Sequence, residues 1–432
     1  MMVRRAFASQ IKFVGLIAFF ADDFRPRLGA FMRFTLGLVG TLAHRLRRFQ
    51  GLHRVLYWSR RNLWRGVKEA FLEFARWVLA PSRRFGPPQE AFSVYQALRT
   101  GYPQLQGRIV LEDQGNPVVA PDSLLAIGGY LQYAEQPWPI LWSTHDRATL
   151  VGESLALISN KRVCVEAVYG HERMRDDPAF RFLRLPPPVR LPGNWTSIVS
   201  RWTPTNCRTN YTHWLLDALP RLALLSEFPP DTRILVPKNL FPSEEESLAA
   251  LGLLDRCRFT GETHLKVERY FFSGPTTMLQ GYNPYGVQFL RRSFLPKRDP
   301  HYSGPRRFFI QRTGDARNVE NDDQLQNLFS RLGWGIVHPG RLKFTEQVKL
   351  FSEAEAICGT IGSGFTNGVF CQPRCKWILL AQDFMLDGWL EWISQVVGSD
   401  YRYLICPTGY ERIIHVDIAK LEAILRELGL AN

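Results

Sequence analysis

The sequence predicts an α/β protein with two halves of alternating strands and helices, preceded by a basic helical arm. Three observations support this class. Short strand-like runs alternate with helical periods along the last third of the chain, a proline-containing linker separates that third from an earlier alternating segment, and positive charge gathers at the N-terminus. Strands that alternate with helices form parallel sheets with right-handed crossovers. Two such Rossmann-like halves leave a cleft between them, where ligands usually bind.

The predicted arm covers residues 1–86. It holds 17 Lys and Arg against four acidic residues, whereas the other 346 residues carry 37 basic and 36 acidic side chains. Over 41–80, apolar residues recur at a helical period with arginines between them. The apolar segments 11–20 and 28–43 are shorter than the roughly 20 residues that a spanning helix needs. We therefore expect the arm to lie on an anionic membrane surface.

Two alternatives for the arm are a helix that binds a protein partner and a segment that binds nucleic acid. Trp58 and Trp64 fall where a helix would bury them, which disfavours stacking on bases. The protein is expected to bind no nucleic acid.

Composition narrows the class of protein further. Apolar residues make up 45% of the chain, enough for a sizeable core. The seven cysteines are odd in number and without paired spacing, and Asp22-Asp23 follows the first apolar run where a cleavage site would need small residues. A cytoplasmic protein, peripheral at the inner membrane face, is expected. Cys371 and Cys375 lack a second pair of ligands, so no metal site is predicted.

The first half is predicted over 87–298. Its apolar runs lie at 108–111, 150–158 and 162–168, and strands are expected at 234–236 and 269–272. A helix is expected over 243–251, with Ser243 and Glu246 forming a capping box.

The second half is predicted over 299–432, after the linker 296–305. Strands are expected at 308–310, 336–337, 356–358, 377–380 and 403–405. The helices between and after them are expected near 325–332, 345–354 and 417–428.

One polar cluster lies at 210–221. If this segment is helical, His213 and Asp217 share a face one turn apart. A carboxylate at that spacing can orient the imidazole for proton abstraction from a sugar hydroxyl. The alternative is a helix-surface pair with a structural role, and the spacing does not decide which of the two would be the base.

Two further clusters suit an anion. Arg312 and Arg317 follow the strand at 308–310, and guanidinium groups there can grip diphosphate oxygens. The turn 359–368 is rich in glycine, which lets backbone N–H groups approach an anion. The chain has no Asp-x-Asp motif, which argues against a diphosphate held through a divalent metal. Arginines and a helix end can neutralise a leaving diphosphate instead.

Together these clusters resemble glycosyltransferase family 61, whose members include bacterial capsular-polysaccharide enzymes and eukaryotic xylosyl- and N-acetylglucosaminyltransferases. Residues 210–221 match the family's Asn-aromatic-x-His-Trp-x-x-Asp-x-x-Pro-Arg pattern. Arg312, Arg317 and Asn321 resemble its paired arginines and following asparagine, and Phe344, Glu346-Gln347 and the glycine turn through Asn367 and Phe370 also match. The likeness runs from about 190 to 385.

The resemblance implies a GT-B-like fold and an inverting, metal-independent transfer from a nucleotide-sugar, often a UDP-sugar, to a glycan or polysaccharide. No cofactor is implied. Catalytic positions carried over from the family are His213, Asp217 and Arg221. Donor-binding positions carried over are Arg312, Arg317, Asn321, Gly362, Ser363, Gly364 and Asn367.

Two positions depart from the family pattern. Ile361 stands where the family usually has histidine, and Leu379 stands where it usually has glutamate. Both changes remove polar groups from the expected donor pocket. They motivate an alternative: a catalytically degenerate member that acts as a membrane-associated scaffold in polysaccharide assembly.

Overall fold

The computed structural model divides into two compact units, 1–81 and 82–432. All described residues belong to the second unit: 87–88, 90–103, 105–111, 139–168, 180, 185–278, 281–282, 284–295, 301–312, 318–382, 388–408 and 413–431. The predicted arm, 1–86, lies outside them, so its helical and membrane-binding character stays a prediction, as do the boundaries at 86 and 298. Within the described residues no helix is long and apolar enough to cross a bilayer.

The first sheet is mixed rather than parallel. Its described strands run in the order β1-β5-β4-β3-β9-β6-β7-β8, with β2 on β3. Their bounds are β1 Ala91–Phe92, β2 Gln106–Leu111, β3 Ile140–Val151, β4 Ala156–Ser159, β5 Arg162–Cys164, β6 Val189–Ser197, β7 Arg233–Pro237, β8 Cys257–Thr260 and β9 His264–Ser273. Neighbours among β9, β6, β7 and β8 are parallel, whereas β3 pairs antiparallel with β2, β4 and β9.

The antiparallel part corrects the expectation of a wholly parallel sheet in the first half, and part of its cause is local. The run 150–158 is split by a turn over 152–155. Asn160 and Lys161, both at positive φ, then join β4 to β5 in a two-residue loop. Such loops connect antiparallel strands. Lysine in place of the usual glycine at the second position weakens the sequence signal for this hairpin.

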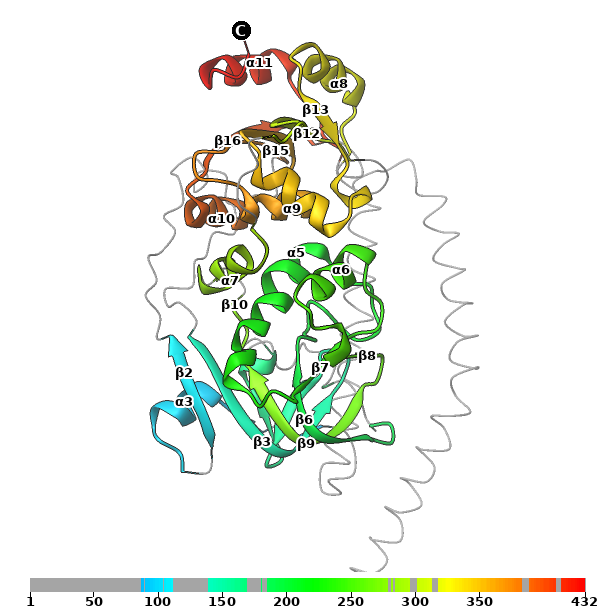
Figure 1. Ribbon diagram of the computed structural model, residues 1–432, viewed down its shortest axis with the longest axis vertical. Helices are drawn as coiled ribbons and strands as arrows, with labels where there is room; N and C mark the ends of the chain where they lie inside the picture. The colour runs from blue at the N-terminus through cyan, green and yellow to red at the C-terminus, as the bar shows by residue number, and fades with distance from the viewer. Residues whose placement is uncertain are drawn as a thin grey trace, which may run out of the picture. The chain divides into compact units, whose positions relative to one another are not determined.

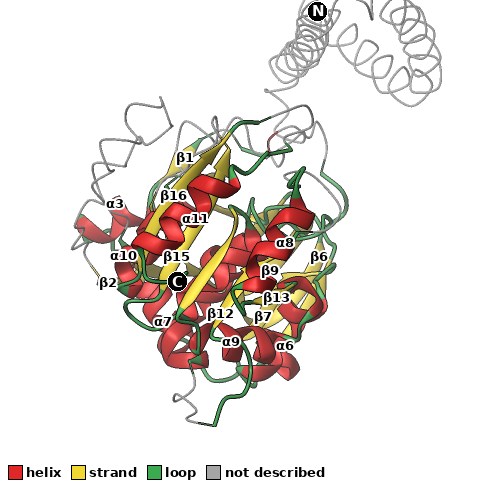
Figure 2. Ribbon diagram, turned by 90° about the horizontal axis from the view of Figure 1, so that it is seen from above, coloured by secondary structure: helices red, strands yellow, loops and turns green. Residues whose placement is uncertain are grey.

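The second sheet is parallel throughout, as predicted. Its order is β13-β12-β14-β15-β16. The strands are β12 Arg307–Ile310, β13 Gly335–Val337, β14 Ala356–Thr360, β15 Lys376–Gln382 and β16 Asp400–Cys406. The helices are α8 Asp322–Arg331, α9 Phe344–Ser352, α10 Trp389–Val397 and α11 Ile418–Glu427, with a 3-10 helix, η8, at Ser363–Phe370. Figure 2 shows α8 and α11 over one face of this sheet.

Side-chain alternation along the strands sorts these helices onto the two faces. Phe309 and Cys358 pack in the cluster that contains Leu325 of α8 and Leu421 of α11. Phe308, Ile310 and Ile357 point the other way, into the cluster that holds the buried residues of α9, η8 and α10. The strand order places β12 beside β14, with the connections leaving them in opposite directions. Ligands of doubly wound sheets bind at the carboxyl ends of such a strand pair.

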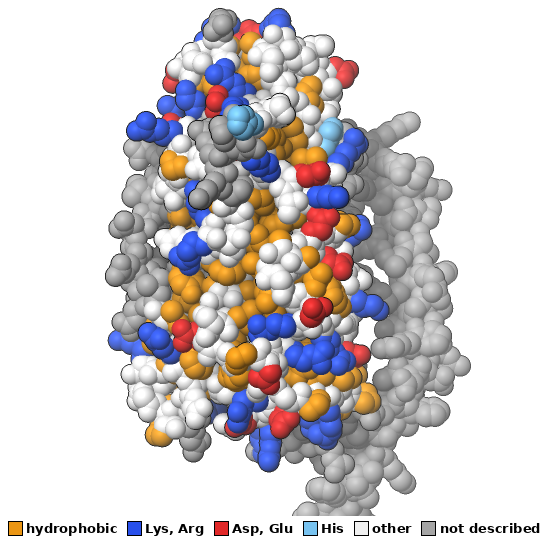
Figure 3. Space-filling view, viewed as in Figure 1, with side chains coloured by type: hydrophobic (Ala, Val, Ile, Leu, Met, Phe, Trp, Pro, Cys, Tyr) orange, Lys and Arg blue, Asp and Glu red, His pale blue; other side chains and the backbone are white. Residues whose placement is uncertain are grey.

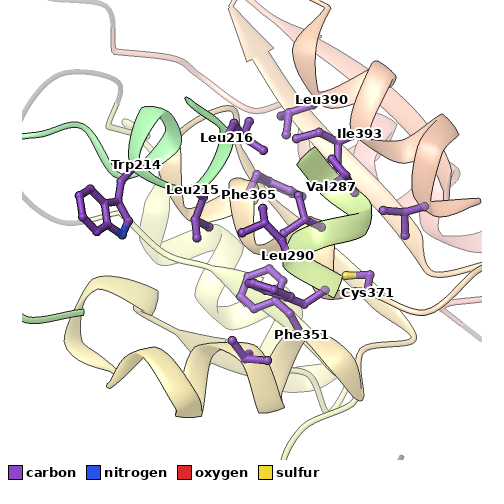
Figure 4. Packing of buried hydrophobic residues seen from close by; sticks show 14 of the residues in the cluster. Trp214, Leu215, Leu216, Val287, Leu290, Phe351, Phe365, Cys371, Leu390 and Ile393 are labelled. Atoms are coloured by element: carbon purple, nitrogen blue, oxygen red, sulfur yellow. The ribbon is translucent and has the colours of Figure 1, made fainter. Parts of the chain in front are cut away.

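Helices from both halves fill the layer between the sheets (Figure 1). The first half contributes α6 Pro242–Ala250, α7 Pro284–Phe294 and the crossover 211–227, which begins with α5 Tyr211–His213. These helices share one hydrophobic cluster with α9, η8 and α10. Figure 4 shows its members Leu216, Leu290, Phe365 and Ile393 packed together. The halves are thus joined by a common core, and a cleft between them stays a prediction.

The capping of α6 differs from the prediction. The helix begins at Pro242, and Glu244 Oε2 accepts a hydrogen bond from the Phe241 backbone N–H at 2.8 Å. Glu246 instead accepts from the Phe344 N–H at 2.6 Å, at the start of α9. Proline at the first helical position is favoured because its missing N–H would be unpaired there anyway. The capping box at Ser243 and Glu246 was therefore wrong by two residues, and Glu246 joins the two halves.

Charged side chains of both signs are interspersed over the face of the described residues seen in Figure 3. This matches the near balance of 37 basic and 36 acidic residues after position 86.

Candidate active site

The first polar cluster begins at Asn210, which caps the crossover helix. Its side-chain oxygen accepts from the Thr212 N–H at 2.9 Å, and its backbone carbonyl accepts from the Trp214 N–H at 2.8 Å. Asparagine is among the preferred residues for this position. The cap places His213 on the first helical turn. Ser363 of η8 donates to the same Asn210 oxygen at 3.3 Å, so the cap also meets the glycine turn of the other half.

His213 and Asp217 are in direct contact, as their spacing predicted. Nδ1 of His213 is hydrogen-bonded to Oδ2 of Asp217. The segment Trp214–Ala218 is a single π turn, closed by the Leu219 N–H on the Trp214 carbonyl. Single π turns inside helices often mark functional sites. The Asp217 side chain is only 3% exposed, whereas that of His213 keeps 28% exposure. The carboxylate therefore holds the imidazole from the buried side.

Trp202 fixes the same imidazole from one face. The two rings are stacked, with centroids 4.9 Å apart and planes inclined by 9°. The neighbouring Arg201 lies over the Trp202 ring, its Cζ 5.6 Å from the centroid. No sequence pattern predicts a role for either residue. The available signal was an adjacent arginine and tryptophan in the polar loop that follows a strand.

Arg221 lies beneath this loop and is buried. One of its guanidinium nitrogens, Nη1, donates to the Val199 carbonyl at 3.4 Å. Its own carbonyl accepts from the Ser273 hydroxyl at 3.1 Å. Arg221 thereby ties the crossover helix to the loop carrying Trp202 and to the end of β9. This position suits a residue that supports the site from within.

Several of the residues predicted to bind the donor lie at the carboxyl ends of β12 and β14. Arg312 follows β12 and is half-buried, and Gly362 follows β14. A Cβ added to Gly362 would lie 2.3 Å from Arg312 Nη1, so the absence of a side chain lets the guanidinium approach the turn. Ser363 and Gly364 are half-buried at the start of η8. Arg317 lies outside the described residues, so its place in the site stays a prediction.

Asn367 joins the two halves through a buried relay. Its Oδ1 accepts from the Tyr211 hydroxyl at 2.8 Å, and its Nδ2 donates to Gln347 Oε1, also at 2.8 Å. Gln347 donates onward to the Leu342 carbonyl at 3.0 Å. Burial raises the pKa of the Tyr211 hydroxyl far above its usual range, so it stays a neutral donor. A second contact, between the hydroxyls of Thr212 and Thr366 at 2.9 Å, runs alongside.

Asn321 lies at the start of α8. Its Oδ1 accepts from the Val416 N–H at 3.0 Å, while its Nδ2 donates to the Val416 carbonyl at 2.8 Å and to Gln324 at 3.1 Å. Both ends of the amide are therefore engaged with the protein. This geometry anchors the segment before α11.

Ile361 and Leu379, the two departures from the family pattern, are both buried in the cluster between the sheets. Leu379 lies on β15 in register with Gly359 of β14 and Tyr403 of β16. The hydrophobic residues at these positions are thus absorbed into the core.

A buried carboxyl group supports the cap region, a role that no sequence pattern predicts. Thr209 donates its hydroxyl to Glu244 Oε2, the same oxygen that accepts from Phe241. Burial raises the pKa of Glu244 to about 7, against the smaller lowering effects of these hydrogen bonds and of Arg208. Thr209 immediately precedes Asn210, so Glu244 helps to fix the start of the crossover helix.

Metal ligands are not clustered in the described part of the chain: it holds no group of three or more His, Cys, Asp or Glu side chains placed to bind an ion.

Comparison with known proteins matches the segment that contains most of these residues. A search of curated proteins gave no match. A model of the family described as Glycosyltransferase 61 matches residues 211–378, a segment that begins at α5 and ends within β15. It includes the His213–Asp217 pair, Arg312 and the glycine turn. The segment 211–378 is therefore identified as a match to glycosyltransferase family 61, the family that its motifs resemble.

Proposed function

We propose that this protein transfers a sugar from a nucleotide-sugar donor to a glycan or polysaccharide acceptor, with inversion at the anomeric carbon. The observation that carries the proposal is the direct contact between the polar cluster at 210–221 and the glycine turn at 359–368. Asn210, three residues before His213 of the acceptor-side half, is hydrogen-bonded to Ser363 of the glycine turn. A base and an anion-binding turn held together in this way suit a single displacement between two substrates.

The geometry supports His213 as the base. Because Nδ1 is hydrogen-bonded to the buried Asp217, the other ring nitrogen, Nε2, is left to accept a proton. In the proposed step Nε2 removes the acceptor hydroxyl proton as that oxygen bonds to the anomeric carbon. The bond from this carbon to the diphosphate oxygen breaks, and the nucleoside diphosphate leaves with the electron pair. Asp217 orients the imidazole and stabilises the positive charge that it gains.

The leaving diphosphate needs groups that neutralise its charge as the bond breaks. Arg312, Arg317 and the backbone N–H groups of Ser363 and Gly364 would supply them without a divalent metal. The parallel second sheet favours this placement, since β12 and β14 end beside one another. We assign Asn321, Asn367 and Arg221 to positioning roles because each is engaged with protein groups in the interior. A GT-B-like arrangement and a UDP-sugar donor are part of the proposal.

A second candidate function is that of a scaffold without transferase activity. The hydrophobic Ile361 and Leu379 favour it, because both lie in the core where the family usually carries polar groups. Such a protein would assemble with a polysaccharide-synthesising complex and would bind no nucleotide-sugar.

Thermal shift measurements separate the two candidates. We expect one class among UDP-, GDP-, CMP- and dTDP-sugars to stabilise the protein equally with Mg²⁺ and with EDTA. A ligand at 100 times its dissociation constant adds about 2.7 kcal/mol to the free energy of unfolding. Arg312→Ala should lose this shift, and Arg341→Ala, at an exposed arginine of the same half, should keep it. No shift with any donor would favour the scaffold.

The cellular location forms part of the same proposal. We propose that residues 1–86 hold the enzyme on the anionic inner face of the membrane, where a capsular polysaccharide precursor would be extended. Each Lys or Arg near such a surface contributes about 1 kcal/mol to binding. Removal of 1–86 should release the protein from vesicles containing phosphatidylglycerol while donor binding persists. Unchanged co-sedimentation of residues 87–432 would contradict this role.

A further inference from the structure

The loop between β6 and the crossover helix carries a cationic group beside the base. Arg201 lies over the indole of Trp202, and that indole stacks on His213. The Arg201 guanidinium and the His213 imidazole therefore both contact the indole ring of Trp202. Neither Arg201 nor Trp202 has a role in the transfer described above.

The loop is held firmly by hydrogen bonds along its length. Ser200 and Thr203 exchange backbone hydrogen bonds at 3.2 Å, and their hydroxyls are 3.0 Å apart. Thr203 also donates to the Ile198 carbonyl at 3.0 Å, and the Trp202 N–H donates to the Ser200 hydroxyl at 3.2 Å. Buried Arg221 contacts the loop at Val199. The positions of Arg201 and Trp202 are thus set before any ligand binds, which lowers the entropic cost of binding.

One nitrogen of Arg201 is left in an unfavourable environment. Its Nη1 is buried, and within the described residues it has no hydrogen-bond partner. Stacking on an indole stabilises a guanidinium but satisfies none of its N–H groups. A buried donor without an acceptor costs free energy that an incoming acceptor recovers. The carboxylate closest to the base, that of Asp217, is already engaged with His213.

We propose that Arg201 binds an anionic group, a carboxylate or a phosphate, on the acceptor glycan. The inference rests on the proposed transferase function and names the acceptor class for the same site. An acceptor hydroxyl has to reach His213, and Arg201 and His213 both contact the Trp202 ring. The donor diphosphate is assigned to groups of the other half, at the ends of β12 and β14. Arg201 therefore selects a uronic acid or a phosphorylated sugar, and Trp202 sets its distance from the base.

The test measures binding and transfer with matched acceptor probes. The probes are methyl β-glucuronide, methyl β-glucoside 6-phosphate and uncharged methyl β-glucoside, titrated against the full chain saturated with its nucleotide-sugar or, if no donor is turned over, with the nucleoside diphosphate. We expect an anionic probe to bind the wild type at least tenfold more tightly than the neutral probe. The preferred anion, carboxylate or phosphate, identifies the acceptor type.

Variants of Arg201 then locate the contact. Arg201→Gln should weaken binding of the preferred anionic probe roughly 10- to 100-fold, the range expected for a charged hydrogen bond. Its affinity for the neutral probe and for the donor should be unchanged. The affinity of Arg201→Lys for the anionic probe should lie between those of the wild type and Arg201→Gln, because lysine keeps the charge but loses the planar fork. Arg208→Gln is the matched control: Arg208 is exposed on the same loop, stacked on Phe241.

Two results would overturn the inference. One is equal binding of charged and neutral probes by the wild type. The other is an Arg201→Gln variant that weakens all probes alike, which indicates a structural role. Donor binding separates this failure from that of the proposed function. If the donor still binds and shifts the melting temperature, only the acceptor assignment falls; if no donor binds, the transferase proposal falls as well.

Discussion

At the scale of single residues, the proposed chemistry of His213 follows from the hydrogen bond at its Nδ1, which leaves Nε2 to act on a substrate. Asp217 accepts a hydrogen bond from Nδ1 and is itself almost completely buried, so it is poorly placed to meet a substrate. The sequence leaves two candidate bases, and the hydrogen bond together with the difference in exposure favours His213 as the proposed base. Their spacing alone could not favour either residue, because a helical i to i+4 pair has the same spacing whichever member faces solvent.

Asp217→Asn tests this assignment. The amide can donate to Nδ1, which would favour the tautomer with its proton on Nε2 and remove the base. We expect kcat to fall by roughly 10² to 10⁴ while the donor KM changes little. Single-turnover rates with saturating donor provide the measurement. Asp231→Asn, at an exposed aspartate of the same half, is the control. An unchanged kcat would exclude Asp217 from the mechanism.

Gly362 is a second residue whose role can be isolated. An added Cβ would meet the end of the Arg312 side chain at 2.3 Å, and a flexible guanidinium can move away. Gly362→Ala should therefore raise the donor KM about tenfold, while the melting temperature changes little. Gly340→Ala is a matched control because an added Cβ there meets nothing within 4 Å. A normal donor KM in Gly362→Ala would show that the position of Arg312 does not matter for donor binding.

At the scale of elements, the second sheet could be predicted almost completely and the first only in part. Strands such as Phe308–Ile310 are buried on both faces and bounded by amphipathic helices, which gives a strong periodic signal. The first half contains the hairpin at Asn160-Lys161 and the long strand β3, whose pairing partners are distant in sequence. Local patterns do not encode such partners. Trp202 and Glu244 were missed for the same reason, since their roles depend on contacts made only in the fold.

Glu244 gives α6 a pH-dependent contribution to stability. Its pKa rises from an ordinary 4.5 to about 7 because burial disfavours the carboxylate. An acid of this kind binds its proton more tightly in the folded state. The free energy of unfolding therefore decreases as the pH rises from 4.5 to about 7 and then levels off.

Glu244→Gln keeps a neutral side chain at every pH. We expect it to be more stable than the wild type at pH 8, by about 1–3 kcal/mol, and to match it near pH 4. Urea denaturation at both pH values measures the difference. Glu245→Gln, at the exposed neighbouring glutamate, should show no such pH dependence. A lower stability of Glu244→Gln at pH 8 would mean that the ionised carboxylate is needed to hold Thr209.

At the scale of the whole molecule, the two halves of the described unit are joined by polar contacts at the edge of a shared hydrophobic layer. The clusters on either side of this layer were predicted as separate sites on separate halves. The hydrogen bonds that connect the two clusters were not predicted, because they depend on side chains such as Asn367, which is fully buried. An asparagine in a glycine turn suggests a ligand contact. Its burial instead makes it a fixed point between the helix that carries His213 and the glycine turn.

Tyr211→Phe tests whether this connection supports both stability and catalysis. It removes one hydroxyl and leaves the buried Asn367 oxygen without that donor. The cost to the free energy of unfolding should be about 1–3 kcal/mol, measured by urea denaturation. Because Tyr211 lies two residues before His213, kcat should fall as well, while the donor KM stays within a few-fold of the wild type. Tyr102→Phe, at an exposed tyrosine, should change neither quantity. A variant that loses stability but keeps a full kcat would show that the relay holds the halves together without aligning the base.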